Sequence, residues 1–111
     1  MAYRGEEIKF AIGLTAEGFS MDDDDFDIEV RTTSRSIKGW KNPPEGEESL
    51  DVIIFKETEG SAPGWYCIAD TTTLDVGAMT VIATAYVPDA HANDGVRTTI
   101  AKAALGKLEA P

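Results

Sequence analysis

The stretch AMTVIATAYV, residues 78–87, is the longest strand candidate in the chain, and Pro88 ends it. A run rich in Val, Ile, Thr and Tyr that is bounded by turn residues is typical of a β-strand, and we expect this one to be central in its sheet. The connection that follows contains Asp94-Gly95, a pair that favours a tight turn. Because alternation resumes at residues 96–100, we predict a hairpin of two strands.

Strict alternation of apolar and polar residues predicts two half-buried strands in the N-terminal third. The pattern runs through residues 7–14 and again through residues 26–31. A period of two places all the apolar side chains of a strand on one face. Each of these strands should therefore cover a core with one face and meet solvent with the other.

The middle of the chain gives less regular signals. Residues 32–42 hold few apolar anchors, and the Pro43-Pro44 pair follows them, so we expect a short strand or edge segment. Residues 50–55 are apolar on both faces and rich in β-branched side chains. This predicts a strand near a sheet centre or at a partner interface.

Two further segments are expected to be extended. Residues 65–69 are aromatic and β-branched, and either Trp65 or Tyr66 should seal the core. Residues 101–108 have high helix propensity, so a short C-terminal helix competes with a continued strand, and we favour the strand.

About seven strands separated by turn signals, with no long amphipathic helical pattern, indicate an all-β fold. The chain has 111 residues, 42% of them hydrophobic and 27% charged, which suits one domain with one core. We therefore predict a single immunoglobulin-like antiparallel β-sandwich that spans residues 1–111.

The charge balance excludes two classes of partner. Ten Lys and Arg against twenty Asp and Glu give a formal net charge of −10, which repels nucleic-acid phosphates and anionic lipid headgroups. The N-terminus has no apolar run of signal-peptide length, and no stretch approaches the length of a membrane span. We expect synthesis in the cytoplasm, with no nucleic acid and no membrane as partners.

The sequence offers little support for a catalytic function. A nucleophile–histidine arrangement could use only Cys67 and His91, and these fall in a predicted strand and a predicted polar loop. Motifs for nucleotide binding or for a serine nucleophile do not occur. We predict a protein that is not an enzyme and needs no cofactor, with Cys67 inert and His91 at the surface.

The acidic run at residues 22–25, with Asp27, supplies hard oxygen ligands of the kind that Ca²⁺ prefers. Asp27 stands where an EF-hand has its glycine, and Thr33 stands where it has its bidentate glutamate. The favoured interpretation is a solvated acidic loop, with a weak calcium site as the alternative. The candidate ligands of that site are Asp22, Asp24, Asp25 and Asp27.

Three aromatic residues are candidates for interaction. Trp40, together with the Trp65–Tyr66 pair, could form a platform for carbohydrate or for a partner protein. The blander alternative is that these rings cover the core and the sheet edges, which is where most aromatic side chains lie.

The order of these signals resembles the immunoglobulin-like N-terminal module of baseplate upper proteins and related tail accessory proteins of phages and prophages. The stretches that carry the resemblance are residues 5–10, 25–30, 74–79, 87–89 and 94–98. As strand-and-turn patterns they are spread over most of the length of the chain, from residue 5 to residue 98. The baseplate proteins themselves are much longer than this chain, with further domains after the module.

The resemblance implies a structural or adaptor role in a tail or baseplate, with other tail proteins and copies of itself as partners. It also implies a final location in a virion or tail-like particle, and it transfers no catalytic or ligand residue to this sequence. The competing hypothesis is a carbohydrate-binding or other ligand-binding module of the adhesin type, with calcium as an optional aid.

Overall fold

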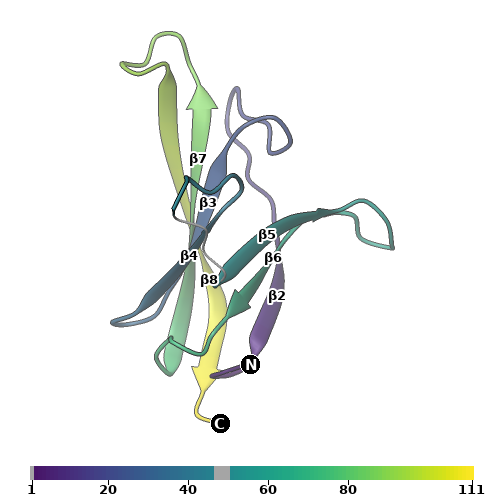
Figure 1. The fold of residues 1–111 in the computed structure, drawn as a ribbon, viewed down its shortest axis with the longest axis vertical. Helices are drawn as coiled ribbons and strands as arrows, with labels where there is room; N and C mark the ends of the chain where they lie inside the picture. Colours follow the sequence, from purple (N-terminus) through teal and green to yellow (C-terminus); the bar gives the residue numbers. More distant parts are fainter. Residues whose placement is uncertain (1, 47–50) are drawn as a thin grey trace.

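Strands make up all the regular structure of residues 2–46 and 51–111, the part of the chain that the computed structural model describes (Figure 1). No helix occurs in these residues, and hence none that could cross a membrane. The strands are β1 (Ala2–Tyr3), β2 (Glu7–Ile12), β3 (Phe26–Arg31), β4 (Ser36–Trp40), β5 (Val52–Glu57), β6 (Gly64–Asp70), β7 (Gly77–Pro88) and β8 (Val96–Glu109).

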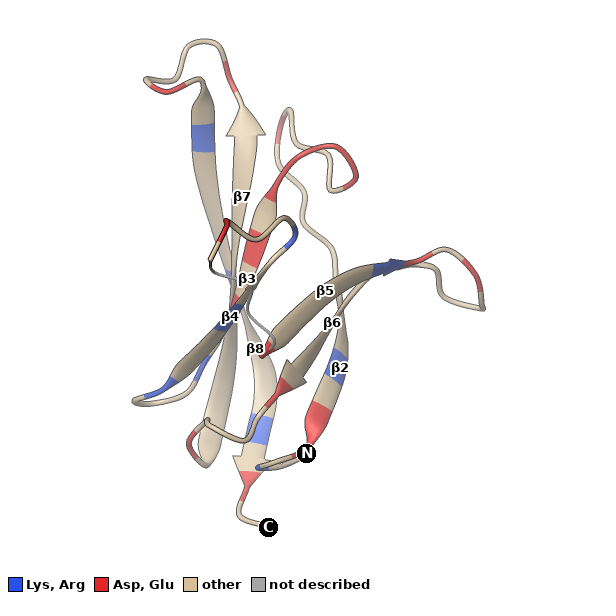
Figure 2. Ribbon diagram, in the orientation of Figure 1, with Lys and Arg blue, Asp and Glu red and all other residues tan. Residues whose placement is uncertain are grey.

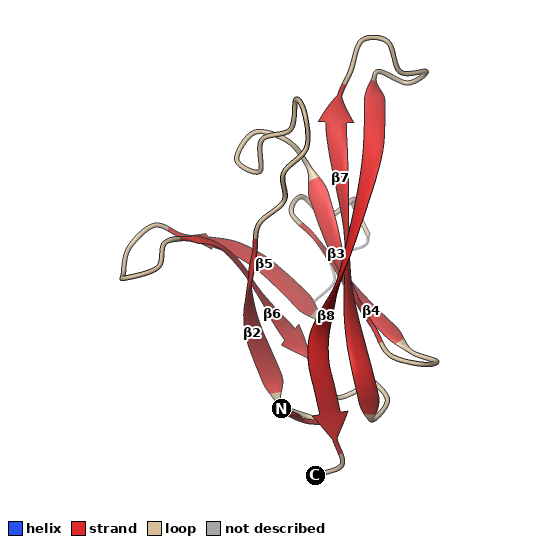
Figure 3. Ribbon diagram, turned by 180° about the vertical axis from the view of Figure 1, so that it is seen from behind, coloured by secondary structure: helices blue, strands red, loops and turns tan. Residues whose placement is uncertain are grey.

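The strands form two sheets that pack as a sandwich, which confirms the predicted all-β fold and is consistent with an immunoglobulin-like one. One sheet has five strands in the order β1-β8-β7-β3-β4, and the other has three in the order β2-β6-β5 (Figure 3). All pairings are antiparallel except that of β1 with the end of β8. The two-residue β1 accounts for the strand beyond the expected seven.

The predicted hairpin is the longest element pair of the fold. Strand β7 lies in the centre of the larger sheet, as expected, and pairs with β8 from Gly77 opposite Leu108 to Pro88 opposite Val96. Gly95 in the connecting turn has a φ of +73°, a conformation that glycine adopts without strain. The C-terminal segment is a strand despite its helix propensity, because β7 pairs with it along its length, with one register shift between Met79 and Thr80.

The core lies between the sheets and follows the alternation of the sequence. On β3, Phe26, Ile28 and Val30 are fully buried, whereas the inward side chains of β2 are only half-buried. The buried hydrophobic set is Phe26, Ile28, Val30, Ile37, Val52, Cys67, Ala69, Leu74, Met79, Val81, Ile82, Ala83, Ala85, Val87 and Leu108.

The two sheets approach most closely where β4 meets β5. A Cβ atom placed on Gly39 of β4 would lie 2.1 Å from the carbonyl oxygen of Val52 on β5, so only glycine fits there. On the opposite side of the sandwich, β2 is an edge strand and β8 has only the two-residue β1 beside its end, so among the described strands none lies between β2 and the rest of β8 (Figure 3). The sandwich is therefore closed along one side and open along the other.

Three predictions about individual segments have different outcomes. Strand β4 is a short edge strand, as expected from residues 32–42. The placement of residues 50–55 near a sheet centre is wrong, because β5 pairs only with β6 and leaves Ile53 45% exposed; Leu50 lies outside the described residues. The alternative for this segment, a partner interface, stays a prediction.

Acidic and basic residues are distributed unevenly over the loops and strands. The loops that join β2 to β3 and β7 to β8 are rich in aspartate, whereas β8 carries most of its charge as Lys and Arg (Figure 2). The loop before β3 holds the predicted acidic run, so its contacts decide whether that run could bind a cation.

Candidate interaction site

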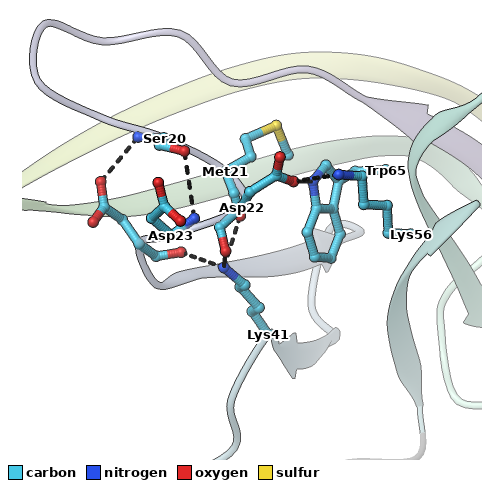
Figure 4. Close-up of polar contacts among 8 residues, drawn as sticks. Ser20, Met21, Asp22, Asp23, Lys41, Lys56 and Trp65 are labelled. Carbon is cyan, nitrogen blue, oxygen red and sulfur yellow. Dashed lines mark hydrogen bonds and ion pairs between the residues drawn. The ribbon is translucent and has the colours of Figure 1, made fainter. Parts of the chain in front are cut away.

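The acidic loop between β2 and β3 is organised around the ammonium group of Lys41. Lys41 Nζ donates hydrogen bonds to the carbonyl oxygens of Met21, Asp22 and Asp24 at 2.7, 2.9 and 2.8 Å (Figure 4). The same ammonium lies 5.3 Å from the ring centre of Trp65, within range of a cation–π contact. A side chain of the protein thus occupies the place where carbonyl oxygens converge.

The carboxylate of Asp22 is held by residues of the smaller sheet. Its Oδ1 accepts hydrogen bonds from Lys56 Nζ at 2.7 Å and from Trp65 Nε1 at 3.0 Å (Figure 4). The hydrogen bond from Lys56 contributes most to lowering the pKa of the Asp22 carboxyl below its usual value, and the bond from Trp65 contributes next. Asp22 therefore ties the loop to β5 and β6 rather than facing the other acids.

The other candidate calcium ligands each have a separate partner. Asp24 Oδ2 accepts a hydrogen bond from the Ser20 N–H at 2.9 Å, and Asp25 Oδ1 accepts one from Asn42 Nδ2 at 2.6 Å. Asp27 lies on β3, where its carboxylate accepts a hydrogen bond from the Tyr86 hydroxyl. Within the described residues, no group of three or more His, Cys, Asp or Glu side chains could hold a metal ion, so the structure does not bring the four carboxylates together.

Asp27 is an unexpected buried acid on the outer face of the larger sheet. Its side chain is 1% exposed; its Oδ2 accepts a hydrogen bond from the Tyr86 hydroxyl at 2.5 Å and lies 3.6 Å from Lys38 Nζ. The bond to Asp27 raises the pKa of Tyr86 to about 12. Sequence alternation predicted only that Asp27 faces away from the core, and the register of three strands was needed to show that neighbours cover it.

The three candidate aromatic residues lie on separate surfaces. The ring of Trp65 faces inward and makes an edge-to-face contact with Phe26 at 5.4 Å, so Trp65 is the residue that seals the core. Tyr66 lies on the outer face of the smaller sheet, stacked on Phe55 with the ammonium of Lys9 4.7 Å from its ring centre. These rings form no common platform with Trp40.

Trp40 borders a small hollow at the end of β4. The hollow has a volume of about 270 Å³, and its walls include Tyr86, Asn42 and Asp25. Lys38 Nζ lies 5.3 Å from the Trp40 ring centre. An aromatic ring beside carboxylate and amide groups is a combination that can hold a small polar ligand.

Cys67 and His91 lie on different elements. Cys67 is fully buried on β6, and burial raises the pKa of its thiol to about 12, which keeps it protonated and unreactive near neutral pH. His91 is exposed in the β7–β8 loop, where its backbone N–H donates to Asp89 Oδ1 at 3.0 Å. This placement agrees with an inert cysteine and a surface histidine.

The open side of the sandwich carries a row of adjoining hollows, which we call the open groove. Three adjoining hollows of about 300, 220 and 140 Å³ follow one another between β2 and β8. They share Phe10 and Leu105 at one junction and Leu14 and Ala101 at the other. The open groove therefore runs along β8 from Thr99 to Lys107.

Both rims of the open groove are sheet edges. Among the described strands, β2 pairs only with β6, and β8 pairs with β7 on one side and with β1 only at its last residues, Leu108 and Glu109. The floor of the open groove is lined by small apolar side chains, among them those of Val81, Ala83, Ala101 and Ala103. Sequence reasoning missed this feature, because edge and centre are set by pairing rather than by the composition of a strand.

Comparison with protein-family models, with curated proteins and with solved structures gives no match for this chain. The arguments about its function therefore rest on the surfaces described above. The open groove with its two sheet edges is the most extensive of them, and the hollow beside Trp40 is separate from it.

Proposed function

We propose that this chain is a non-enzymatic structural or adaptor module of a phage or prophage tail or baseplate assembly and that it acts through protein–protein packing. The observation that carries the proposal is the open groove, flanked by the edges of β2 and β8. Such a surface suits a protein that completes its sheets against neighbours.

Exposed sheet edges support this proposal on physical grounds. An unpaired edge presents rows of N–H and C=O groups that another strand can use, and proteins that remain single usually cover or shorten such edges. Strand β8 is 14 residues long, and its edge stays open from Val96 to Lys107 within the described structure. Ile100 is 62% exposed there, which adds apolar area for a partner.

The hydrogen bonding of the buried polar side chains within the chain also favours a structural role. No side-chain nitrogen or oxygen that is buried in the described residues lacks a hydrogen-bond partner. The acidic loop is fixed by Lys41, Lys56 and Trp65, so its conformation is set before any partner arrives. A rigid module with prearranged loops loses little conformational entropy when it binds.

The experiment that tests this role asks whether the protein is part of a particle. Tail particles would be purified from an induced culture of the strain that encodes the chain, examined for it by mass spectrometry and labelled with a specific antibody for electron microscopy. We expect a fixed number of copies per particle and a label at one place on the tail. Particles without the chain would contradict the proposal.

The hollow beside Trp40 favours a second candidate function, the binding of a small carbohydrate. Its aromatic wall suits the apolar face of a sugar ring, and Asn42 and Asp25 offer polar partners for hydroxyl groups. The test is a glycan-array screen of the protein and its Trp40→Ala variant. Binding that the variant loses would support this candidate, and an array with no bound glycan would reject it.

A further inference from the structure

We propose that two copies of this chain join through their open grooves, with β8 of each copy pairing with β2 of the other. The proposal deepens the proposed function, on which it rests, by naming the partner and the strands. It follows from the direction of the two edges, from their level along the open groove and from the charges that they carry.

The two edges run in opposite directions. The chain enters β2 and leaves β8 at the same end of the molecule, so β2 ascends while β8 descends (Figure 1). A two-fold axis along the open groove would place β2 of a second copy beside β8 of the first without reversing either direction. The resulting pairs would be antiparallel, the commoner and slightly more stable arrangement.

The residues that line the hollows show which positions of β2 lie at the same height along the open groove as which positions of β8. The hollow nearest the termini combines residues 8–10 of β2 with residues 105–107 of β8. The next hollow combines residues 10–14 with residues 101–105. Rotation about an axis parallel to the strands preserves these levels, so Glu7 of one copy would lie next to Lys107 of the other.

Charge favours this pair. Glu7 and Lys107 are both exposed, and each projects from the outer face of its own sheet. Within one copy, Glu7 and Lys107 lie on the two opposite outer faces of the sandwich, so they point away from each other. The two-fold axis brings Glu7 of the second copy onto the same face as Lys107 of the first, twice in each dimer.

Pairing of β8 with its own copy is disfavoured by the same argument. Strand β8 carries Arg97, Lys102 and Lys107 and only one acid, Glu109, in a chain whose net charge is −10. In the antiparallel register centred on Lys102, the two Lys102 side chains would face each other, so like charges would be juxtaposed. The edge of β2 begins with Glu7, whose charge is opposite to that of Lys107, and its one cation, Lys9, is paired with Glu57 of its own sheet.

The inner surfaces would extend the core. The floor of the open groove is built from alanine and valine, and the inward side chains of β2, Ile8, Phe10 and Ile12, are only half-buried in the single chain. Joining the edges would remove this apolar surface from water and produce two continuous sheets, each made of strands from both copies. Burial of apolar area is the main driving force of such association.

The first measurement is the mass of the purified full chain by sedimentation equilibrium over a wide concentration range at physiological salt. We expect the mass to rise from 11.9 kDa to twice that value. A chain that stays monomeric at all concentrations, or that forms assemblies other than a dimer, would overturn the proposal.

Charge reversal tests the pairing itself. We expect Glu7→Lys alone and Lys107→Glu alone each to weaken the dimer roughly tenfold, because two ion pairs become like-charge contacts, and the double variant to restore it. Matched controls, Glu59→Lys and Arg35→Glu, lie in exposed loops away from the open groove and should leave the association unchanged. A dimer that responds equally to both sets would overturn the assignment.

A third variant tests the open groove. Ala103→Glu places a carboxylate on the floor, where it is hydrated in the single chain and buried in the dimer, and Ala62→Glu on the β5–β6 loop is the control. We expect Ala103→Glu to be monomeric and, at concentrations where the unmodified chain is also monomeric, to have the same melting temperature; a dimer that survives this substitution would count against the proposal. Failure of these tests leaves the particle experiment untouched, so the two proposals can be rejected separately.

Discussion

Gly39 on β4 faces the carbonyl oxygen of Val52 on β5 so closely that the two sheets touch there backbone to backbone. This contact connects an edge of the five-stranded sheet to an edge of the three-stranded sheet. Because the backbones themselves meet, no rotamer change can make room for a side chain.

The first prediction concerns this contact. We expect Gly39→Ala to lower the free energy of unfolding by about 3 kcal/mol, because a Cβ atom 2.1 Å from the Val52 oxygen forces the sheets apart. Urea denaturation monitored by tryptophan fluorescence measures the loss. Gly13→Ala is the matched control, since a Cβ at Gly13 meets nothing within 4 Å. Equal stability of the two variants would contradict the interpretation.

The second prediction concerns the acidic loop. Lys41→Met removes three hydrogen bonds from a charged donor to the carbonyls of Met21, Asp22 and Asp24, so we expect a loss of about 1–3 kcal/mol of stability. Lys56→Met removes one exposed ion pair to Asp22 and should cost less than about 1 kcal/mol. Hydrogen exchange should accelerate in the loop only for Lys41→Met, and a larger effect of Lys56→Met would reverse our assignment.

The third prediction concerns calcium. Because the carbonyl oxygens of the loop already surround Lys41 Nζ and the four carboxylates have separate partners, we expect millimolar Ca²⁺ to leave the melting temperature and the amide NMR signals of residues 22–27 unchanged. Mg²⁺ at the same concentration controls for ionic strength. Saturable shifts of these signals with Ca²⁺ alone would restore the calcium alternative.

The fourth prediction concerns alkaline pH. The pKa of Tyr86 is raised to about 12 from an ordinary value of 10.0, with the bond to Asp27 as the first cause. The folded state therefore holds this proton more tightly than the unfolded state does, and the associated stability is complete below pH 10 and is lost as the pH rises through 12.

The contribution of Tyr86 to this pH dependence is measured by replacing the residue. Tyr86→Phe should show a shallower decline of stability between pH 10 and pH 12 than the unmodified chain, as measured by urea denaturation at each pH. The buried thiol of Cys67, whose pKa is raised to about 12 from 9.0, contributes a decline of the same sign from pH 9 upward and remains in both proteins. Parallel curves for the two proteins would show that Tyr86 does not contribute.

The strands themselves follow from local patterns in the sequence. Alternation at residues 7–14 and 26–31, and the β-branched run before Pro88, are properties of neighbouring residues, and the corresponding strands β2, β3 and β7 are present. The order of the strands in the sheets depends instead on pairings between distant residues. For this reason the composition of residues 50–55 suggested a central strand, whereas β5 lies at an edge.

The candidate sites show the same division. The sequence singled out the acidic run, but the group that occupies its centre, Lys41 Nζ, comes from a position 17 to 20 residues further along the chain. Likewise Asp27 could be assigned to the outer face of its strand, but not to burial beneath Tyr86, 59 residues away. Long-range partners of this kind become visible only when the register is known.

The pairing of β1 with the end of β8 has a consequence for how the domain can be joined to other chains. It holds Ala2 beside Leu108, so the first described strand and the end of the last one lie together at one pole, while the turn between β7 and β8 lies at the other end of a molecule 48 Å long (Figure 1). A tether attached at either terminus would therefore leave from the same pole. The β7–β8 turn, which holds Asp89 and Asp94, would then be the part of the domain farthest from the tether.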